Sequence, residues 1–231
     1  MPFGFFDPTM LLVLPALIFA MWAQWKVQHT YQKYSKVPAA NGLTGAEMAM
    51  SIMKRNGVND VKIEEVGGVL SDHYDPRVKV VRLSSHNFRE SSIAGIAVGA
   101  HEVGHVLQHA QGYMPLQIRS ALAPVAGFGS MLAFPLFFIG ILFGGSMSRM
   151  FMDLGILLFT GAVLFQVVTL PVEFDASKRA LAQLTSSGAI APQEVDGAKK
   201  VLDAAALTYV AAAAMAALQL VRLLLIRNSR N

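Results

Sequence analysis

Four stretches of the chain contain no charged residue for long enough to cross a lipid bilayer, and they restrict the fold more than any other feature. They cover residues 8–25, 120–148, 154–172 and 204–221. A membrane-spanning helix needs about 20 predominantly apolar residues, and each stretch is close to or above that length. The sequence therefore predicts a mainly α, polytopic membrane protein with four transmembrane helices.

The composition agrees with this prediction. Hydrophobic residues make up 54% of the chain and charged residues 15%, whereas soluble domains carry about 25% charge. The net charge of +4 comes without a dense run of Lys and Arg, so we expect no nucleic-acid partner. Met1 to Asp7 contains no Lys or Arg, unlike the start of a secretory signal, so residues 8–25 are expected to be a retained anchor.

Four spans place residues 26–119 and 173–203 on one side of the membrane. We expect these two segments to form the catalytic region of a single domain that covers residues 1–231. Of the 19 Lys and Arg residues, 15 lie on this side and 4 on the other. Only positions near the spans count, and on this side they are Lys26, Lys33, Lys36, Arg119, Lys178 and Arg179. The positive-inside rule then predicts that the catalytic region faces the cytoplasm. Between the second and third spans, Gly144-Gly145-Ser146 indicates a tight hairpin, after which Arg149 and Asp153 are spaced to pair.

The segment 26–119 predicts a small α+β region. Thr44 and Glu47 have the spacing of a capping box, which predicts a helix over 45–56 that ends at Gly57. Residues 61–66 and 78–83 alternate as strands do, and the polar segment between them reads as a loop. A second helix is expected from Ser91, as its N-cap, to about Gln111.

That second helix carries the motif His101-Glu102-Val-Gly-His105. Residues four apart lie on one face of a helix, so both imidazoles can reach one zinc ion. Glu102 is placed to act as a general base toward the attacking water. The chain has no cysteine, so any metal must be held by His, Asp or Glu. The motif therefore predicts a Zn²⁺-dependent metallopeptidase.

A catalytic zinc site needs a third protein ligand, and Glu173 is the predicted one. It follows the third span directly and lies on the same side of the membrane as His101. In a helix over 173–184, small residues such as Ala176 would share its face and allow close packing against the zinc helix. His109 continues the four-residue spacing, but it lies about 6 Å further along the helix axis. We expect His109 to be a polar residue near the helix end.

Several of these segments together resemble a known family. His101-Glu-Val-Gly-His105, the paired spans, Glu173-Phe-Asp-Ala-Ser177 and the block Ser71-Asp-His-Tyr-Asp-Pro-Arg77 are similar to the YugP-like neutral zinc metallopeptidases of bacteria. The resemblance covers roughly residues 8–225. It implies a gluzincin-type peptidase with a zincin-like catalytic region, located in the bacterial cytoplasmic membrane.

The layout is also similar, more distantly, to HtpX-type and CAAX prenyl-type membrane proteases. That resemblance implies that Glu173 is the third ligand, in a segment whose closing Asp is here Ser177. Asp175 or Asp72 is then expected to orient a ligand histidine, and the sequence does not choose between them. It also implies that a strand beside the zinc helix binds the substrate backbone, for which residues 78–83 are the candidate.

Peptide hydrolysis develops negative charge on the carbonyl oxygen, and a protein donor usually helps to stabilise it. The predicted donors are His73, Tyr74 and Arg179. The sequence thus predicts an endopeptidase that acts on membrane or membrane-adjacent proteins. The alternative is a membrane scaffold with a closed structural zinc site, in which His109 or Asp175 supplies a fourth ligand. The substrate and the oligomeric state do not follow from the residues.

Overall fold

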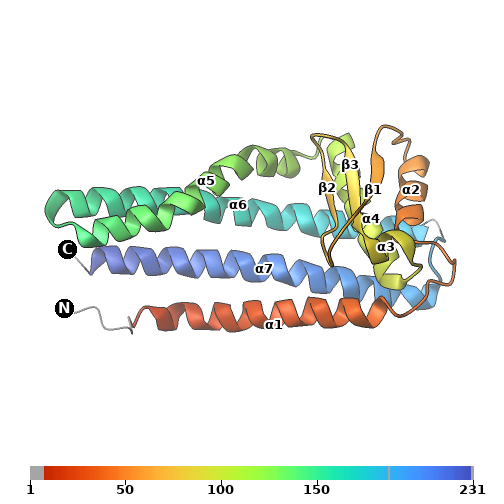
Figure 1. The fold of residues 1–231 in the computed structure, drawn as a ribbon, viewed down its shortest axis with the longest axis horizontal. Helices are drawn as coiled ribbons and strands as arrows, with labels where there is room; N and C mark the ends of the chain where they lie inside the picture. The colour runs from red at the N-terminus through yellow and green to blue at the C-terminus, as the bar shows by residue number, and fades with distance from the viewer. Residues whose placement is uncertain (1–7, 187, 230–231) are drawn as a thin grey trace. The chain divides into compact units, whose positions relative to one another are not determined.

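A computed structural model describes residues 8–186 and 188–229. Over these residues the chain forms seven helices and three short strands (Figure 1). The helices are α1 (Met10–Tyr34), α2 (Gly45–Arg55), α3 (Ser85–Arg89), α4 (Ile93–Ala110), α5 (Met114–Leu142), α6 (Gly145–Ser186) and α7 (Pro192–Asn228). The strands are β1 (Lys62–Val66), β2 (His73–Asp75) and β3 (Val80–Ser84).

Four of the described helices, α1, α5, α6 and α7, are long and apolar enough to cross a membrane. This confirms the predicted mainly α protein with four candidate spans and a small sheet. Helix α6 differs from the prediction because it runs unbroken through Pro171 to Ser186. Residues 173–184 are helical, as expected, but they are the last part of a helix that begins at Gly145.

The chain divides into two compact units. Met1–Ala23, Gln117–Leu170 and Thr208–Asn231 form the first, and Gln24–Leu116 with Pro171–Leu207 form the second. One metallopeptidase domain over 1–231 stays a prediction.

In the first unit, the hairpin between α5 and α6 turns at Gly145, whose φ of 65° is a conformation that glycine adopts without strain. Beyond this turn, Ser148 donates a hydrogen bond to the carbonyl of Gly140. The expected pairing of Arg149 with Asp153 does not form. Asp153 instead accepts hydrogen bonds from Arg227 of α7, because a contact between helices replaces the one along the helix.

In the second unit, the strands lie side by side in the order β1-β3-β2 (Figure 1). Strand β3 pairs in parallel with β1 and antiparallel with β2. Both of its edges are therefore occupied, so the prediction that residues 78–83 bind a substrate backbone is wrong. The polar segment predicted as a loop contains β2, which is the edge strand on this side.

The core of the second unit forms where α2 packs on α4. The capping box predicted for α2 is confirmed, since Thr44 and Glu47 exchange side-chain to backbone hydrogen bonds. Glycine permits the close approach, because a Cβ at Gly99 would lie 2.4 Å from the carbonyl oxygen of Gly45. Ser92, not the predicted Ser91, is the N-cap of α4, and its hydroxyl accepts the backbone N–H of Gly95.

Candidate metal centre

The three predicted metal ligands come together in the second unit. One ligand atom from each of His101, His105 and Glu173 lies within 4.8 Å of the other two. The Nε2 atoms of His101 and His105 lie 3.3 and 3.5 Å from the same Glu173 carboxylate oxygen. Glu173 and His105 are buried, and the His101 side chain is 13% exposed. Two imidazoles and one carboxylate thus converge on one small space.

Helix α6 reaches this space because Gly104 of α4 has no side chain. A Cβ at Gly104 would lie 2.5 Å from the carbonyl oxygen of Ala176, which is fully buried on α6. Real Cβ atoms do not approach a carbonyl oxygen so closely, so a larger residue would push the helices apart. The small pair Gly104 and Ala176 therefore sets the distance from Glu173 to the two histidines.

Glu102 lies next to His101 and is buried, with 7% of its surface exposed. Burial raises the pKa of its carboxyl to about 7, although the nearby His101 opposes this shift. The backbone N–H of Tyr74 in β2 is close enough to this carboxyl to oppose the rise of its pKa. A carboxyl with a pKa near neutrality is suited to accept and return a proton.

Comparisons with known proteins agree with this geometry. Residues 9–228 match the family model described as "Putative neutral zinc metallopeptidase". The chain belongs to this family. It is also 49% identical over 215 residues to the "Putative membrane protease YugP" of Bacillus subtilis (strain 168), which covers 93% of this chain and 94% of that protein. No solved structure matches the chain.

Membership of the family makes zinc the cofactor, and the donor set fits it. Zinc in catalytic sites takes three protein ligands, and two histidines with one glutamate are an established combination. The buried His-His-Glu group can hold such an ion. In such a site, each imidazole is oriented by the residue that hydrogen-bonds its other ring nitrogen.

The first predicted ligand, His101, is oriented by Ser177. The hydroxyl of Ser177 lies 3.2 Å from the Nδ1 atom of His101 and leaves Nε2 directed to Glu173. Ser177 stands where the wider membrane proteases are expected to carry an Asp. The hydroxyl is thus in contact with a ligand, and neither Asp175 nor Asp72 has that role.

The second predicted ligand, His105, is oriented by a buried glutamine. The side-chain oxygen of Gln108 lies 3.0 Å from His105 Nδ1, and Gln108 is fully buried. Its nitrogen donates to the carbonyl of Val172 at 2.8 Å and to the Asp175 carboxylate at 2.9 Å. Asp175 is in turn paired with Arg179. Asp175 therefore acts on His105 only through Gln108.

The other expected carboxylate, Asp72, is used for packing. It accepts hydrogen bonds from the backbone and hydroxyl of Ser84 and from the amide of Asn87. These contacts tie the start of β2 to the end of β3 and to α3. No local pattern predicts these contacts, because the partners lie 12 and 15 residues further along the chain.

The predicted oxyanion donors lie in different surroundings. His73 Nδ1 lies 2.8 Å from the carbonyl oxygen of Ser71, and its other nitrogen lies 3.5 Å from Arg82. Arg179 is held by Asp175, donates to Gln111, and stacks 5.6 Å above the ring of Tyr113.

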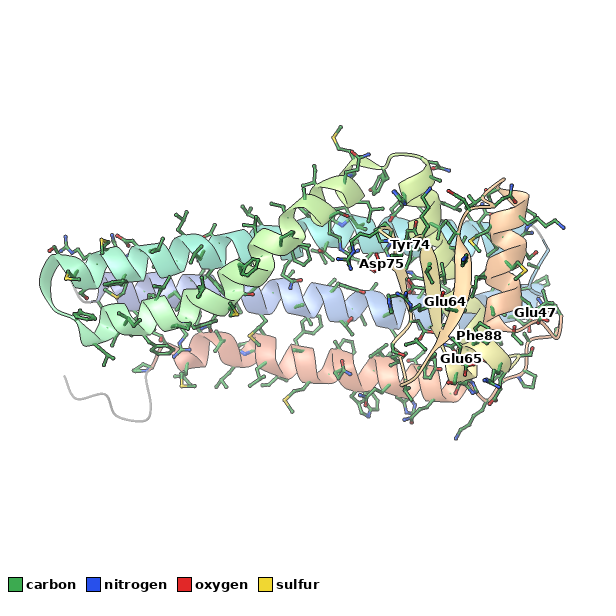
Figure 2. All side chains as sticks on the ribbon, turned by 45° about the horizontal axis from the view of Figure 1, so that its top comes forward. Glu47, Glu64, Glu65, Tyr74, Asp75 and Phe88 are labelled. Carbon is green, nitrogen blue, oxygen red and sulfur yellow. The ribbon has the colours of Figure 1, made fainter. Side chains whose placement is uncertain are left out.

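Of the three, Tyr74 is the residue in contact with Glu102, through its backbone. Figure 2 labels its side chain on β2 beside Asp75. The phenol oxygen lies 2.8 Å from His109 Nδ1. Burial and the charges of Asp60 and Asp75 raise the pKa of this phenol to about 12, so it keeps its proton at neutral pH.

Sequence reasoning missed Gln108. Its role could have been predicted from its position three residues after His105, which places both side chains on the same face of α4. A polar residue that is fully buried next to a ligand is expected to hydrogen-bond it.

Proposed function

We propose that this protein is a zinc-dependent endopeptidase in which His101, His105 and Glu173 hold the metal and Glu102 is the general base. The observation that carries the proposal is the convergence of the three ligand atoms within 4.8 Å, directly beside the buried Glu102. Family membership supports the same chemistry.

Zinc, when bound, supplies the Lewis acid that polarises the scissile carbonyl and makes the attacking water more acidic. The proton transfers are carried out by a side chain of the protein. Glu102 accepts a proton from the water as it attacks, and later delivers that proton to the leaving amine. Its raised pKa suits both steps, since the carboxyl gains and loses a proton at little cost near pH 7.

The substrate backbone is proposed to dock along β2. Only one side of β2 pairs with β3, and on the other side the Tyr74 backbone already reaches Glu102. An extended peptide that adds to this edge would run past the general base. Such docking replaces the predicted role of residues 78–83, most of which belong to β3, a strand that is paired on both sides.

Tyr74 is the proposed donor to the developing oxyanion, with His73 and Arg179 as the other two candidates. Its neutral phenol lies on the strand that contacts Glu102, and it has only one partner, His109 Nδ1 at 2.8 Å, to leave before it donates to a substrate. Arg179 already donates to Asp175 and Gln111, so its guanidinium would have to leave both to reach a substrate.

The alternative function is a scaffold with a closed structural zinc site. It requires a fourth protein ligand, for which His109 and Asp175 were the candidates. His109 contacts Tyr74, and Asp175 contacts Gln108 and Arg179. A buried carboxylate with a raised pKa beside the ligands has no use in a closed site. Both observations favour the peptidase.

The four candidate spans indicate that the peptidase works in a lipid bilayer. The name of the relative, a putative membrane protease, supports the same location. We propose that its substrates are membrane or membrane-adjacent proteins and that its site faces the cytoplasm. The distribution of Lys and Arg supports the orientation.

Removal and return of zinc test the proposal. The purified full chain in detergent is treated with a chelator and then given one equivalent of Zn²⁺, and cleavage of an unstructured protein is followed by mass spectrometry. Cleavage is expected to stop with the chelator and to return with zinc. Cleavage that continues unchanged in fully zinc-free protein would overturn the proposal.

A further inference from the structure

A pocket of about 180 Å³ lies beside α4, on the flank that carries Glu102. Val106, which lines it, follows Glu102 by four residues and so lies one turn further on the same face. Tyr74 lines it as well, and the backbone of Tyr74 lies close to Glu102. The pocket is thus connected to the general base by one turn of helix and by one strand residue.

The polar groups in the wall of this pocket are already bound to one another. The Tyr74 hydroxyl lies 2.8 Å from His109 Nδ1. The Lys79 ammonium is paired with the Asp60 carboxylate. The remaining wall is apolar, and it consists of Val58, Val61, Val106 and Ala110. A charged ligand group would have to compete for these partners or lose its hydration, whereas an apolar group only covers apolar surface.

The size of the pocket also limits which apolar groups can enter it. An apolar cavity of about 150 Å³ is known to accept benzene. A pocket of about 180 Å³ therefore has room for a leucine, methionine or phenylalanine side chain. Ala110 and His109 are exposed, so such a side chain can enter from solvent.

We propose that this pocket is a specificity subsite, which receives a mid-sized apolar side chain from a substrate residue close to the bond that is cut. The proposal rests on the proposed peptidase function and adds the class of residue that the enzyme selects. A peptide paired with β2 would pass Tyr74, and one of its side chains would then lie over Val106 and Ala110.

Substitutions that fill the pocket test this. Ala110→Leu fills it from α4, and Val61→Leu fills it from the segment just before β1. Ala182→Leu, at an exposed alanine of α6 that does not line the pocket, is the matched control. Each zinc-loaded full-length protein cleaves an unstructured protein, and the cleavage sites are mapped by mass spectrometry. Equal zinc content and equal thermal midpoints establish that the variants are folded.

Wild type and Ala182→Leu are expected to select Leu, Met or Phe at one position near the cut. Both filled variants should shift this position to Ala, Gly or Ser, with at least a 10-fold fall in kcat/KM for the larger residues. Cleavage with an unchanged profile in both filled variants would overturn the subsite and leave the peptidase standing. A wild-type preference for charged residues at that position would overturn it as well. A zinc-loaded wild type that cuts nothing would overturn the peptidase, and the subsite with it.

Discussion

Gly104 of α4 and Ala176 of α6 meet so closely that a Cβ on Gly104 would lie 2.5 Å from the Ala176 carbonyl oxygen. This contact brings a glutamate from one helix to two histidines on another, across 72 residues of sequence between His101 and Glu173. A backbone contact between helices, and not only the ligand residues themselves, thus determines the geometry of the metal centre.

Substitution of Gly104 tests this relationship. Gly104→Ala is expected to destabilise the fold by about 1–3 kcal/mol, because the helices must separate to admit the methyl group. It should also weaken zinc binding, since Glu173 moves with α6. Gly127→Ala is the control, because a Cβ there meets nothing within 4 Å. Thermal midpoints in detergent and zinc titrations measure both effects, and equal zinc affinity in the two variants would contradict the account.

Gln108 is predicted to orient His105 for the metal. Gln108→Leu removes the hydrogen bond to His105 Nδ1 and is expected to lower zinc affinity about 10–100-fold, the usual cost of losing a partner of a ligand. Gln111→Leu removes a contact to Arg179 that lies further from the ligands, and it should change the affinity less than 3-fold. Competition with a chromophoric zinc chelator gives both values. Equal affinities would show that the glutamine is a packing residue only.

The cluster of two histidines and one glutamate was predictable from the sequence because the spacing of its residues expresses helix geometry directly. His101 and His105 lie one helical turn apart, and Glu173 follows a span whose length is set by the bilayer. The capping box of Thr44 and Glu47 was visible for the same reason, since both bonds are local. Which residue holds each imidazole was not predictable from such rules, because Ser177 meets His101 across 76 residues.

The order of the strands in the sheet was likewise not predictable from local sequence patterns. A three-residue strand such as β2 carries too little alternation to be recognised in a polar segment. Its existence moves β3 from the edge to the middle of the sheet, which reverses the expected substrate strand. Strand order depends on contacts between distant segments, and no local pattern records it.

Removal of one polar group from Tyr74 and from His73, in separate variants, tests which of the two is the oxyanion donor. Tyr74→Phe is expected to lower kcat at least 10-fold with zinc content intact, since a donor to the developing oxyanion is lost. His73→Phe should change kcat less, because its ring contacts Ser71 and Arg82 instead. Steady-state kinetics with a fluorogenic peptide, beside zinc analysis, decide this. Loss of zinc in Tyr74→Phe, or a larger effect at His73, would count against Tyr74 as the donor.

The predicted orientation can be measured because the chain contains no cysteine. Single cysteines are introduced at two exposed serines, Ser146 in the hairpin and Ser186 at the end of α6. In intact bacterial spheroplasts, a membrane-impermeant maleimide is expected to label Ser146→Cys, and to label Ser186→Cys only after the membrane is permeabilised. The reverse pattern would place the catalytic region outside the cell and leave the metal centre unaffected.

Zinc content and cleavage, measured on the same preparations of wild type, Glu102→Gln and Glu173→Ala, separate the general base from the third ligand. If Glu102 is the general base, Glu102→Gln retains one zinc per chain and loses cleavage by at least 100-fold. If Glu173 is the third ligand, Glu173→Ala loses its zinc. Cleavage by Glu102→Gln at the wild-type rate, or full zinc in Glu173→Ala, would contradict the account.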